Sequence, residues 1–219
     1  MDSGAQDSGH LIDRSIEGRQ RSGCSIQKPR RDHQRDEYPK LGLDTVMQIL
    51  MILVSDRDPD YRDGDMPLQL ARFAVPYYIF CDADIDLVVA TRDGGPPWLR
   101  PEAYGEGSSS EITQRFKTDR LARDALNDTL SFDQIEVLDF AAAFCVGAPS
   151  AIWQDADPSS SASVIASFLR HGKPVAITPG IFDLAPFGAS DGLLIVGQSL
   201  EAPVLAAKAL LAMLREMPN

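Results

Sequence analysis

From residue 47 to the end of the chain, short apolar runs alternate with longer segments of helical periodicity. The apolar runs have the length and composition of buried strands, and an amphipathic or turn-rich segment separates each run from the next. Strands that alternate with helices favour a parallel sheet covered on both faces. The sequence therefore predicts an α/β domain of three layers, with helices on both sides of a mainly parallel sheet.

The expected elements follow from these runs. We expect strands at residues 47–54, 85–90, 141–146, 173–178 and 192–196, and helices at 67–81, 114–127, 158–171 and 200–217. Pro76 should kink or interrupt the first helix. Because ligands in such folds bind beyond the carboxyl ends of strands, the loops after Val54, Val146 and Ile177 are the candidate site.

Residues 1–46 differ in composition from the rest of the chain. They are rich in Ser, Gly, Asp, Gln and Arg, with almost no apolar periodicity, so we predict a disordered N-terminal extension and a folded domain at 47–219. The extension carries eight Lys/Arg and eight Asp/Glu. The remaining 13 basic and 24 acidic residues give the domain a charge of 13 − 24 = −11. A domain this acidic repels a phosphate backbone, so we expect no nucleic-acid partner.

Several other classes of site find no support in the sequence. No run of about 18 apolar residues is present, so we expect no membrane partner. The three cysteines, Cys24, Cys81 and Cys145, are sparse and odd in number, which favours a reducing compartment and a cytoplasmic location. No histidine pair has zinc-site spacing, and the acidic loop 56–65 lacks the glycine and glutamate of a calcium-binding EF-hand. We therefore expect no metal and no cofactor.

The segment 173–180, Lys-Pro-Val-Ala-Ile-Thr-Pro-Gly, has the pattern of a strand that runs into a sharp turn. In α/β proteins a catalytic nucleophile often occupies such a strand end. Here Thr178 holds that position and Pro179 follows it. The scaffold of an active site is therefore predicted without its usual chemistry.

Six further segments form a distinctive set in this order: Ala74–Phe80, Val89–Pro97, Arg115–Asp119, Asp139–Phe140, Gly172–Ala176 and Asp191–Gln198. Together they resemble the ThiJ/PfpI (DJ-1-like) superfamily of the class I glutamine amidotransferase-like fold, and most closely its chaperone and glutathione-independent glyoxalase branch. The resemblance covers roughly residues 47–216 and implies a flavodoxin-like α/β/α sandwich. Active members use a cysteine at the elbow, a histidine after it and a glutamate on the first helix.

This chain departs from the family pattern at each of those positions. The resemblance places Thr178 at the cysteine, Pro179 at the histidine and Arg72 at the glutamate. A threonine hydroxyl is a poor nucleophile without a strong base alongside it. The sequence therefore lacks the Cys-His-Glu set on which the family's carbonyl chemistry depends.

The surrounding pocket is altered too. The family's oxyanion glycines after the third long strand correspond to Gly147, Ala148 and Pro149, and Pro149 has no N–H to donate. With Gly180 at the elbow, these residues form the predicted vestigial pocket. Only residues 181–190 separate the elbow from Asp191, where the family has several tens of residues, so we expect a sheet shortened after the elbow.

Two residues could in principle replace the missing chemistry. His171 would have to act as the base for Thr178, but it precedes the strand and Thr178 ends it. Cys145 could supply the thiol, although its neighbours Phe144 and Val146 favour a buried, inert cysteine. Trp98 and Trp153 could line a ligand site or serve only in packing.

Two functions remain after this comparison. The leading hypothesis is a catalytically degenerate relative with a binding or assembly role, which pairs with itself or with an active paralogue and accepts a small carbonyl ligand. The alternative is that the chain keeps the family's reaction, as a glutathione-independent glyoxalase (D-lactate dehydratase) or protein deglycase acting on methylglyoxal. The absent Cys-His-Glu set separates the two.

Overall fold

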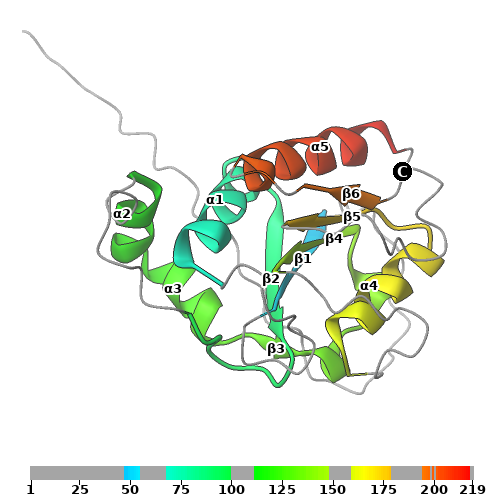
Figure 1. The fold of residues 1–219 in the computed structure, drawn as a ribbon, viewed down its shortest axis with the longest axis horizontal. Helices are drawn as coiled ribbons and strands as arrows, with labels where there is room; N and C mark the ends of the chain where they lie inside the picture. The colour runs from blue at the N-terminus through cyan, green and yellow to red at the C-terminus, as the bar shows by residue number, and fades with distance from the viewer. Residues whose placement is uncertain are drawn as a thin grey trace, which may run out of the picture.

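A computed structural model describes residues 47–54, 68–99, 111–147, 159–178, 194–197, 199 and 201–217. Residues 1–46 and the acidic loop 56–65 lie outside this part of the chain, so the predictions made for them stay predictions. The described segments form a six-stranded sheet in the order β3-β2-β1-β4-β5-β6, with every pairing parallel. Helices lie on both sides of it (Figure 1). The predicted three-layer α/β fold is confirmed.

The strands are short and almost entirely buried in the centre of the sheet. They are β1 (Gln48–Leu53), β2 (Asp86–Thr91), β3 (Leu130–Ser131), β4 (Ala142–Val146), β5 (Val175–Thr178) and β6 (Leu194–Val196). The helices are α1 (Leu70–Cys81), α2 (Glu111–Thr118), α3 (Arg120–Asn127), α4 (Ser161–Arg170) and α5 (Ala202–Glu216), with short 3-10 turns at Phe132–Gln134 and Val137–Asp139. Each central strand is apolar at successive positions because both of its faces are covered.

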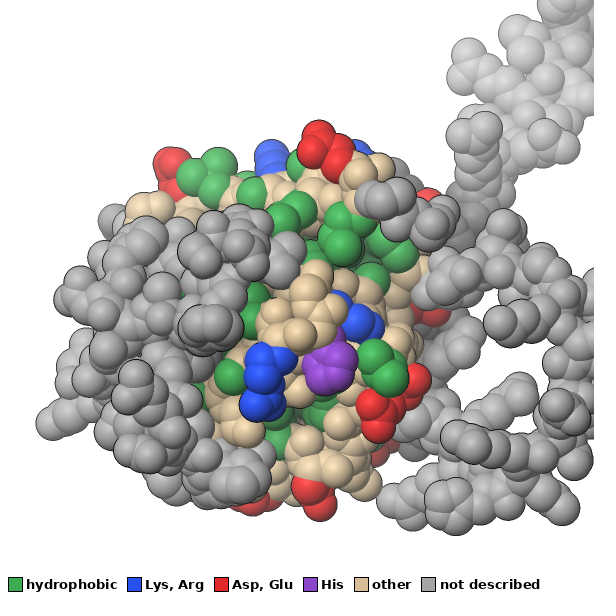
Figure 2. Space-filling view, turned by 90° about the vertical axis from the view of Figure 1, so that its right-hand side faces the viewer, with side chains coloured by type: hydrophobic (Ala, Val, Ile, Leu, Met, Phe, Trp, Pro, Cys, Tyr) green, Lys and Arg blue, Asp and Glu red, His purple; other side chains and the backbone are tan. Residues whose placement is uncertain are grey.

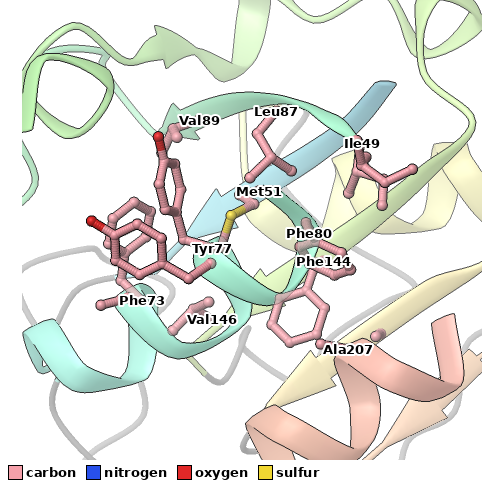
Figure 3. Packing of buried hydrophobic residues seen from close by; sticks show 14 of the residues in the cluster. Ile49, Met51, Phe73, Tyr77, Phe80, Leu87, Val89, Phe144, Val146 and Ala207 are labelled. Atoms are coloured by element: carbon pink, nitrogen blue, oxygen red, sulfur yellow. The ribbon is translucent and has the colours of Figure 1, made fainter. Parts of the chain in front are cut away.

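The two faces of the sheet belong to two separate cores. On one face, alternate strand residues such as Met51, Phe144 and Val146 pack against Phe73 and Tyr77 of α1 and against α5 (Figure 3). On the other face, the intervening strand residues pack against Val164, Ile165, Phe168 and Leu169 of α4. Successive side chains of a strand point to opposite faces, which assigns each strand residue to one core.

The structure corrects three details of the predicted elements. Of the two outcomes expected at Pro76, a kink or an interruption, the interruption is wrong, because α1 continues through this buried proline. The single helix predicted at 114–127 is wrong, because two helices meet at Asp119, whose extended backbone ends α2 and whose carboxylate accepts the Ala122 N–H at the start of α3 (3.1 Å). The two-residue strand β3 was not predicted, since so short a segment has no measurable periodicity.

Candidate functional site

The carboxyl ends of β1, β4 and β5 lie side by side at one edge of the sheet. Leu53 pairs with Val146, and Val146 pairs with Thr178. Two backbone hydrogen bonds extend this row, from Val54 N to the Val146 carbonyl (2.9 Å) and from Gly147 N to the Thr178 carbonyl (3.0 Å). The chain order reverses between β1 and β4, which is the position at which open α/β sheets bind ligands. The three loops predicted as the site do begin together.

Thr178 ends β5 at this edge as a buried residue. Its side chain is 1% exposed, and its Oγ1 has no hydrogen-bond partner among the described residues. Ala176, two residues earlier, belongs to the α1/α5 core, so the alternation of the strand directs Thr178 to that same face. Pro179 and Gly180 follow outside the described residues. A buried hydroxyl without a hydrogen-bonded base is not activated as a nucleophile.

Gly147 connects β4 to the turn at the centre of the site. Its φ is +104°, and a Cβ at this position would come within 2.5 Å of the Val54 carbonyl oxygen, so only glycine fits. Its N–H donates to the Thr178 carbonyl and is therefore committed to the sheet ladder. Ala148 and Pro149, the other predicted oxyanion positions, lie outside the described residues. Gly147 itself supports the edge of the sheet.

Cys145 is buried on the opposite face of the sheet from Thr178. It belongs to the α4 core and is 0% exposed, whereas its neighbour Val146, which pairs with Thr178, belongs to the α1/α5 core. Its Sγ donates a hydrogen bond to the Gly147 carbonyl (3.4 Å), and burial raises the pKa of the thiol. The interpretation of Cys145 as an inert core cysteine is supported, because both its direction and its protonation oppose a nucleophilic role at the elbow.

His171 and Arg72 complete the set of residues singled out in the sequence. His171 follows α4 and precedes β5, so it lies at the other end of that strand from Thr178; it is exposed, and its Nδ1–H donates to the Ser167 carbonyl (2.7 Å). Figure 2 shows a histidine side chain (purple) at the surface beside Lys and Arg side chains (blue). Arg72 lies half-buried in the first turn of α1. Because α1 connects the parallel neighbours β1 and β2, its first turn begins at the edge that carries Thr178. The structure thus brings Thr178, Gly147 and the start of α1 to one edge and leaves His171 elsewhere.

A small pocket of about 100 Å³ opens at the same edge, beyond the ends of β1 and β2. Its walls come from Leu53, from Thr91 at the end of β2, and from the loop that follows, including Arg92, Asp93, Pro97 and Trp98. Trp98, proposed from the sequence as either a ligand contact or a packing residue, lines this pocket; Trp153 lies outside the described residues. Arg92 and Asp93 were not identified as candidates. Their place directly after a strand, before Gly94 and Gly95, was the signal available.

Neither a metal site nor a membrane segment is found in the part of the chain that the structure describes. No group of three or more His, Cys, Asp or Glu side chains there could hold a metal ion. Among the described helices, none combines the length and apolar character that a membrane crossing requires.

Comparisons with known proteins place the chain by its fold. No protein-family model matches it, and no curated protein sequence matches it. Among solved structures, Rapid Encystment Protein 24 kDa of Francisella tularensis is similar at 14% identity over 77% of this chain and 99% of that one, with a TM-score of 0.53. A ThiJ/PfpI domain protein from Brachyspira murdochii (14% identity, 78% and 98% covered, TM-score 0.48) and glyoxalase III from Candida albicans (14%, 77% and 97%, 0.49) are also similar.

The likeness to the encystment protein, at 14% identity and a TM-score of 0.53, shows the fold alone.

Proposed function

We propose that this chain is a catalytically degenerate DJ-1/PfpI-like protein with a binding or assembly role. The observation that carries the proposal is Thr178 at the elbow: a buried hydroxyl with no hydrogen-bond partner among the described residues, followed in the chain by a proline. Nucleophilic attack on a carbonyl needs a thiolate, or a hydroxyl with a base in hydrogen-bond reach. Among the described residues, neither is found at this position.

The remaining candidate groups support the same proposal. The Cys145 thiol faces the α4 core, away from the elbow, and the imidazole of His171 lies beyond the other end of β5. Arg72 stands where the resemblance implies a carboxylic acid, so the group that would move a proton is replaced by a fixed cation. The proposal also includes a small carbonyl ligand and a reducing cytoplasmic location. It further includes association of the chain with a second copy of itself or with an active paralogue.

The decisive experiment measures consumption of methylglyoxal and formation of D-lactate by the purified chain, against a sample without protein. We expect no difference between the two. Turnover that is saturable and that survives Thr178→Ala would instead favour the alternative, a glyoxalase or deglycase that uses another nucleophile. Cys145→Ala would then show whether that nucleophile is the α4-facing thiol.

A second experiment introduces the residues that active family members carry at the positions of Thr178, Pro179 and Arg72. Thr178→Cys alone should gain reactivity toward iodoacetamide without gaining lactate formation, because no histidine follows the new thiol and Arg72 occupies the position at which the resemblance implies an acid. The triple change Arg72→Glu, Thr178→Cys and Pro179→His should remain weak, since Pro149 supplies no oxyanion N–H. Robust lactate formation by Thr178→Cys alone would contradict the proposal that the whole pocket has lost the groups needed for catalysis.

A further inference from the structure

The pocket beyond the ends of β1 and β2 lies at the same edge of the sheet as Thr178 at the elbow. Leu53, in its wall, pairs with Val146, which pairs with Thr178. Leu53 and Val146 both face the α1/α5 core, as Thr178 does by alternation. Two inter-strand spacings separate Leu53 from Thr178, about 10 Å. A ligand held in this pocket would therefore lie at the edge where the fold places ligands, beside the vestigial elbow and separate from it.

The loop that forms the pocket wall is held in place by hydrogen bonds on its outer side. The Thr129 hydroxyl donates to the Gly95 carbonyl (2.6 Å), so the 2.8 Å contact between the Thr91 and Thr129 hydroxyls must use the Thr91 proton. Gly95 N donates in turn to the Thr129 carbonyl (3.1 Å), and Phe132 N donates to the Arg92 carbonyl (3.3 Å). A wall that is already ordered loses little conformational freedom when a ligand binds.

The lining combines the Arg92 cation and the exposed Asp93 carboxylate with apolar surface. Arg92 is half-buried, and its Nη2 donates to Ser159 Oγ (3.2 Å), next to the N-cap residue of α4. A guanidinium carries five N–H donors in a planar fork, so it can hold a neighbouring side chain and also meet a carboxylate. Leu53, Pro97 and Trp98 offer apolar and aromatic contacts to the rest of a ligand.

The size of the pocket limits what it can hold. Its volume of about 100 Å³ is smaller than the roughly 150 Å³ of a cavity that binds benzene. We propose that this pocket binds a small monocarboxylate, with the carboxylate on Arg92 and a short apolar chain against Leu53 and Trp98. The inference rests on the proposed binding role, for which it names the ligand class.

The test follows the fluorescence of Trp98 in the full-length chain. The chain has two tryptophans, so Trp153→Phe leaves Trp98 as the reporter. Propionate is the probe, propionamide is the uncharged probe of the same shape, and sodium chloride keeps the ionic strength constant. We expect a saturable change with propionate and none with propionamide.

Variants identify the cation that is responsible. Arg92→Met should weaken propionate binding by about tenfold or more, because a charge-assisted hydrogen bond is lost. Arg170→Met removes the same charge from an exposed position at the end of α4 and should leave binding unchanged. Asp93 is an exposed carboxylate at the pocket rim and repels the carboxylate of propionate. Asp93→Asn should therefore tighten propionate binding a few-fold. This measurement tests the site even if Arg92→Met fails to fold.

Three results would overturn the inference: no saturable response to propionate in the parent protein, an equal response to propionamide, or equal losses in Arg92→Met and Arg170→Met. Tighter binding of glycine than of propionate by the parent, lost in Asp93→Asn, would replace the simple monocarboxylate with a zwitterion and so overturn it as well. The methylglyoxal assay is independent of these measurements. A chain that forms D-lactate and still binds propionate through Arg92 would refute the proposed function and leave this site standing.

Discussion

Gly147 joins β4 to the turn that follows it through a backbone conformation that an L-residue rarely adopts, and its missing side chain makes room for the backbone that follows β1. A Cβ there would approach the Val54 carbonyl oxygen to 2.5 Å, and that oxygen belongs to backbone that cannot rotate away. We predict that Gly147→Ala lowers the free energy of unfolding by about 3 kcal/mol, the sum of backbone strain and overpacking. Urea denaturation measures the loss.

Gly172 provides the matched control for that substitution. Its φ is +68°, but a Cβ there would meet nothing within 4 Å. Gly172→Ala should therefore cost only the backbone term, about 1 kcal/mol. Equal losses in the two variants would show that the contact with Val54 relaxes and that the close approach of the strands does not require glycine.

Thr178 keeps a hydroxyl in the core without a hydrogen bond among the described residues. Thr178→Val replaces that hydroxyl with a methyl group of similar size, and we predict a gain of about 1 kcal/mol in the free energy of unfolding. Thr129→Val is the contrasting variant, because Thr129 Oγ1 is bonded to both Thr91 and Gly95. That change should cost about 1–3 kcal/mol, since it leaves two partners unsatisfied. A loss in Thr178→Val as large as in Thr129→Val would reveal a partner for the Thr178 hydroxyl.

The sequence predicted the positions of these residues at strand ends more successfully than it predicted the face of the sheet on which each side chain lies. Thr178 and Gly147 were both expected at strand ends, and both are there. The opposite orientation of Cys145 and Thr178 was not expected, because it depends on the pairing of Val146 with Thr178, and register is a property of two strands together. Arg92 escaped notice for a related reason: its relation to Leu53 arises only when β1 and β2 pair.

At the scale of elements, a charged cluster joins α1, α2 and α3 on the outside of the α1/α5 core. Arg115 of α2 donates to both oxygens of Asp82 (2.7 and 2.8 Å), and its guanidinium lies 3.8 Å from the centre of the Tyr78 ring. Burial, with the Asp119 carboxylate alongside, raises the pKa of Tyr78, so its hydroxyl stays protonated and donates to Asp119 (3.1 Å). Tyr78 and Asp82, from α1 and its C-terminal end, thus contact Asp119 at the start of α3 and Arg115 of α2.

We predict a modest coupling energy between Arg115 and Asp82 in a double-mutant cycle with Arg115→Met and Asp82→Asn. The two side chains are 43% and 60% exposed, so water screens the pair and the expected coupling is about 0.5–1 kcal/mol. The pair Arg120 and Asp124, at 3.5 Å and with Arg120 86% exposed, should couple by only about 0.3 kcal/mol. The cycles would contradict this ordering if both pairs coupled equally, or if 1 M salt left the Arg115 pair unchanged.

How well an element was predicted depended on its length and on whether its ends are marked in the apolar pattern of the sequence. The buried strands β1, β2, β4 and β5 were predicted from apolar runs because both faces of each are covered. The break between α2 and α3 depends on the backbone angle of Asp119 and on its hydrogen bond to Ala122, neither of which changes the apolar pattern. β3 contributes two residues whose strand character comes from their partners Ala90 and Thr91.

For the whole molecule, residues 1–46 carry balanced charge and little apolar sequence, and the buried core begins with β1. Ordering such a segment would cost about 1–2 kcal/mol per residue in backbone entropy without apolar burial to offset it. We predict that the fragment 47–219 has a melting temperature within a few degrees of the full chain, measured by circular dichroism. A fall of ten degrees or more would show that the N-terminal residues stabilise the domain and would refute the predicted domain boundary.

The separation of the sheet into two cores also determines when the thiol of Cys145 can react. A reagent that enters the edge of the sheet near Thr178 meets the α1/α5 side, while the sulfur lies beneath α4 on the other side. Alkylation of Cys145 then requires α4 to detach, so its labelling rate measures how often the domain opens. In a cell exposed to reactive aldehydes, the folded chain would keep this thiol intact, and a labelled Cys145 would mark molecules that had been unfolded.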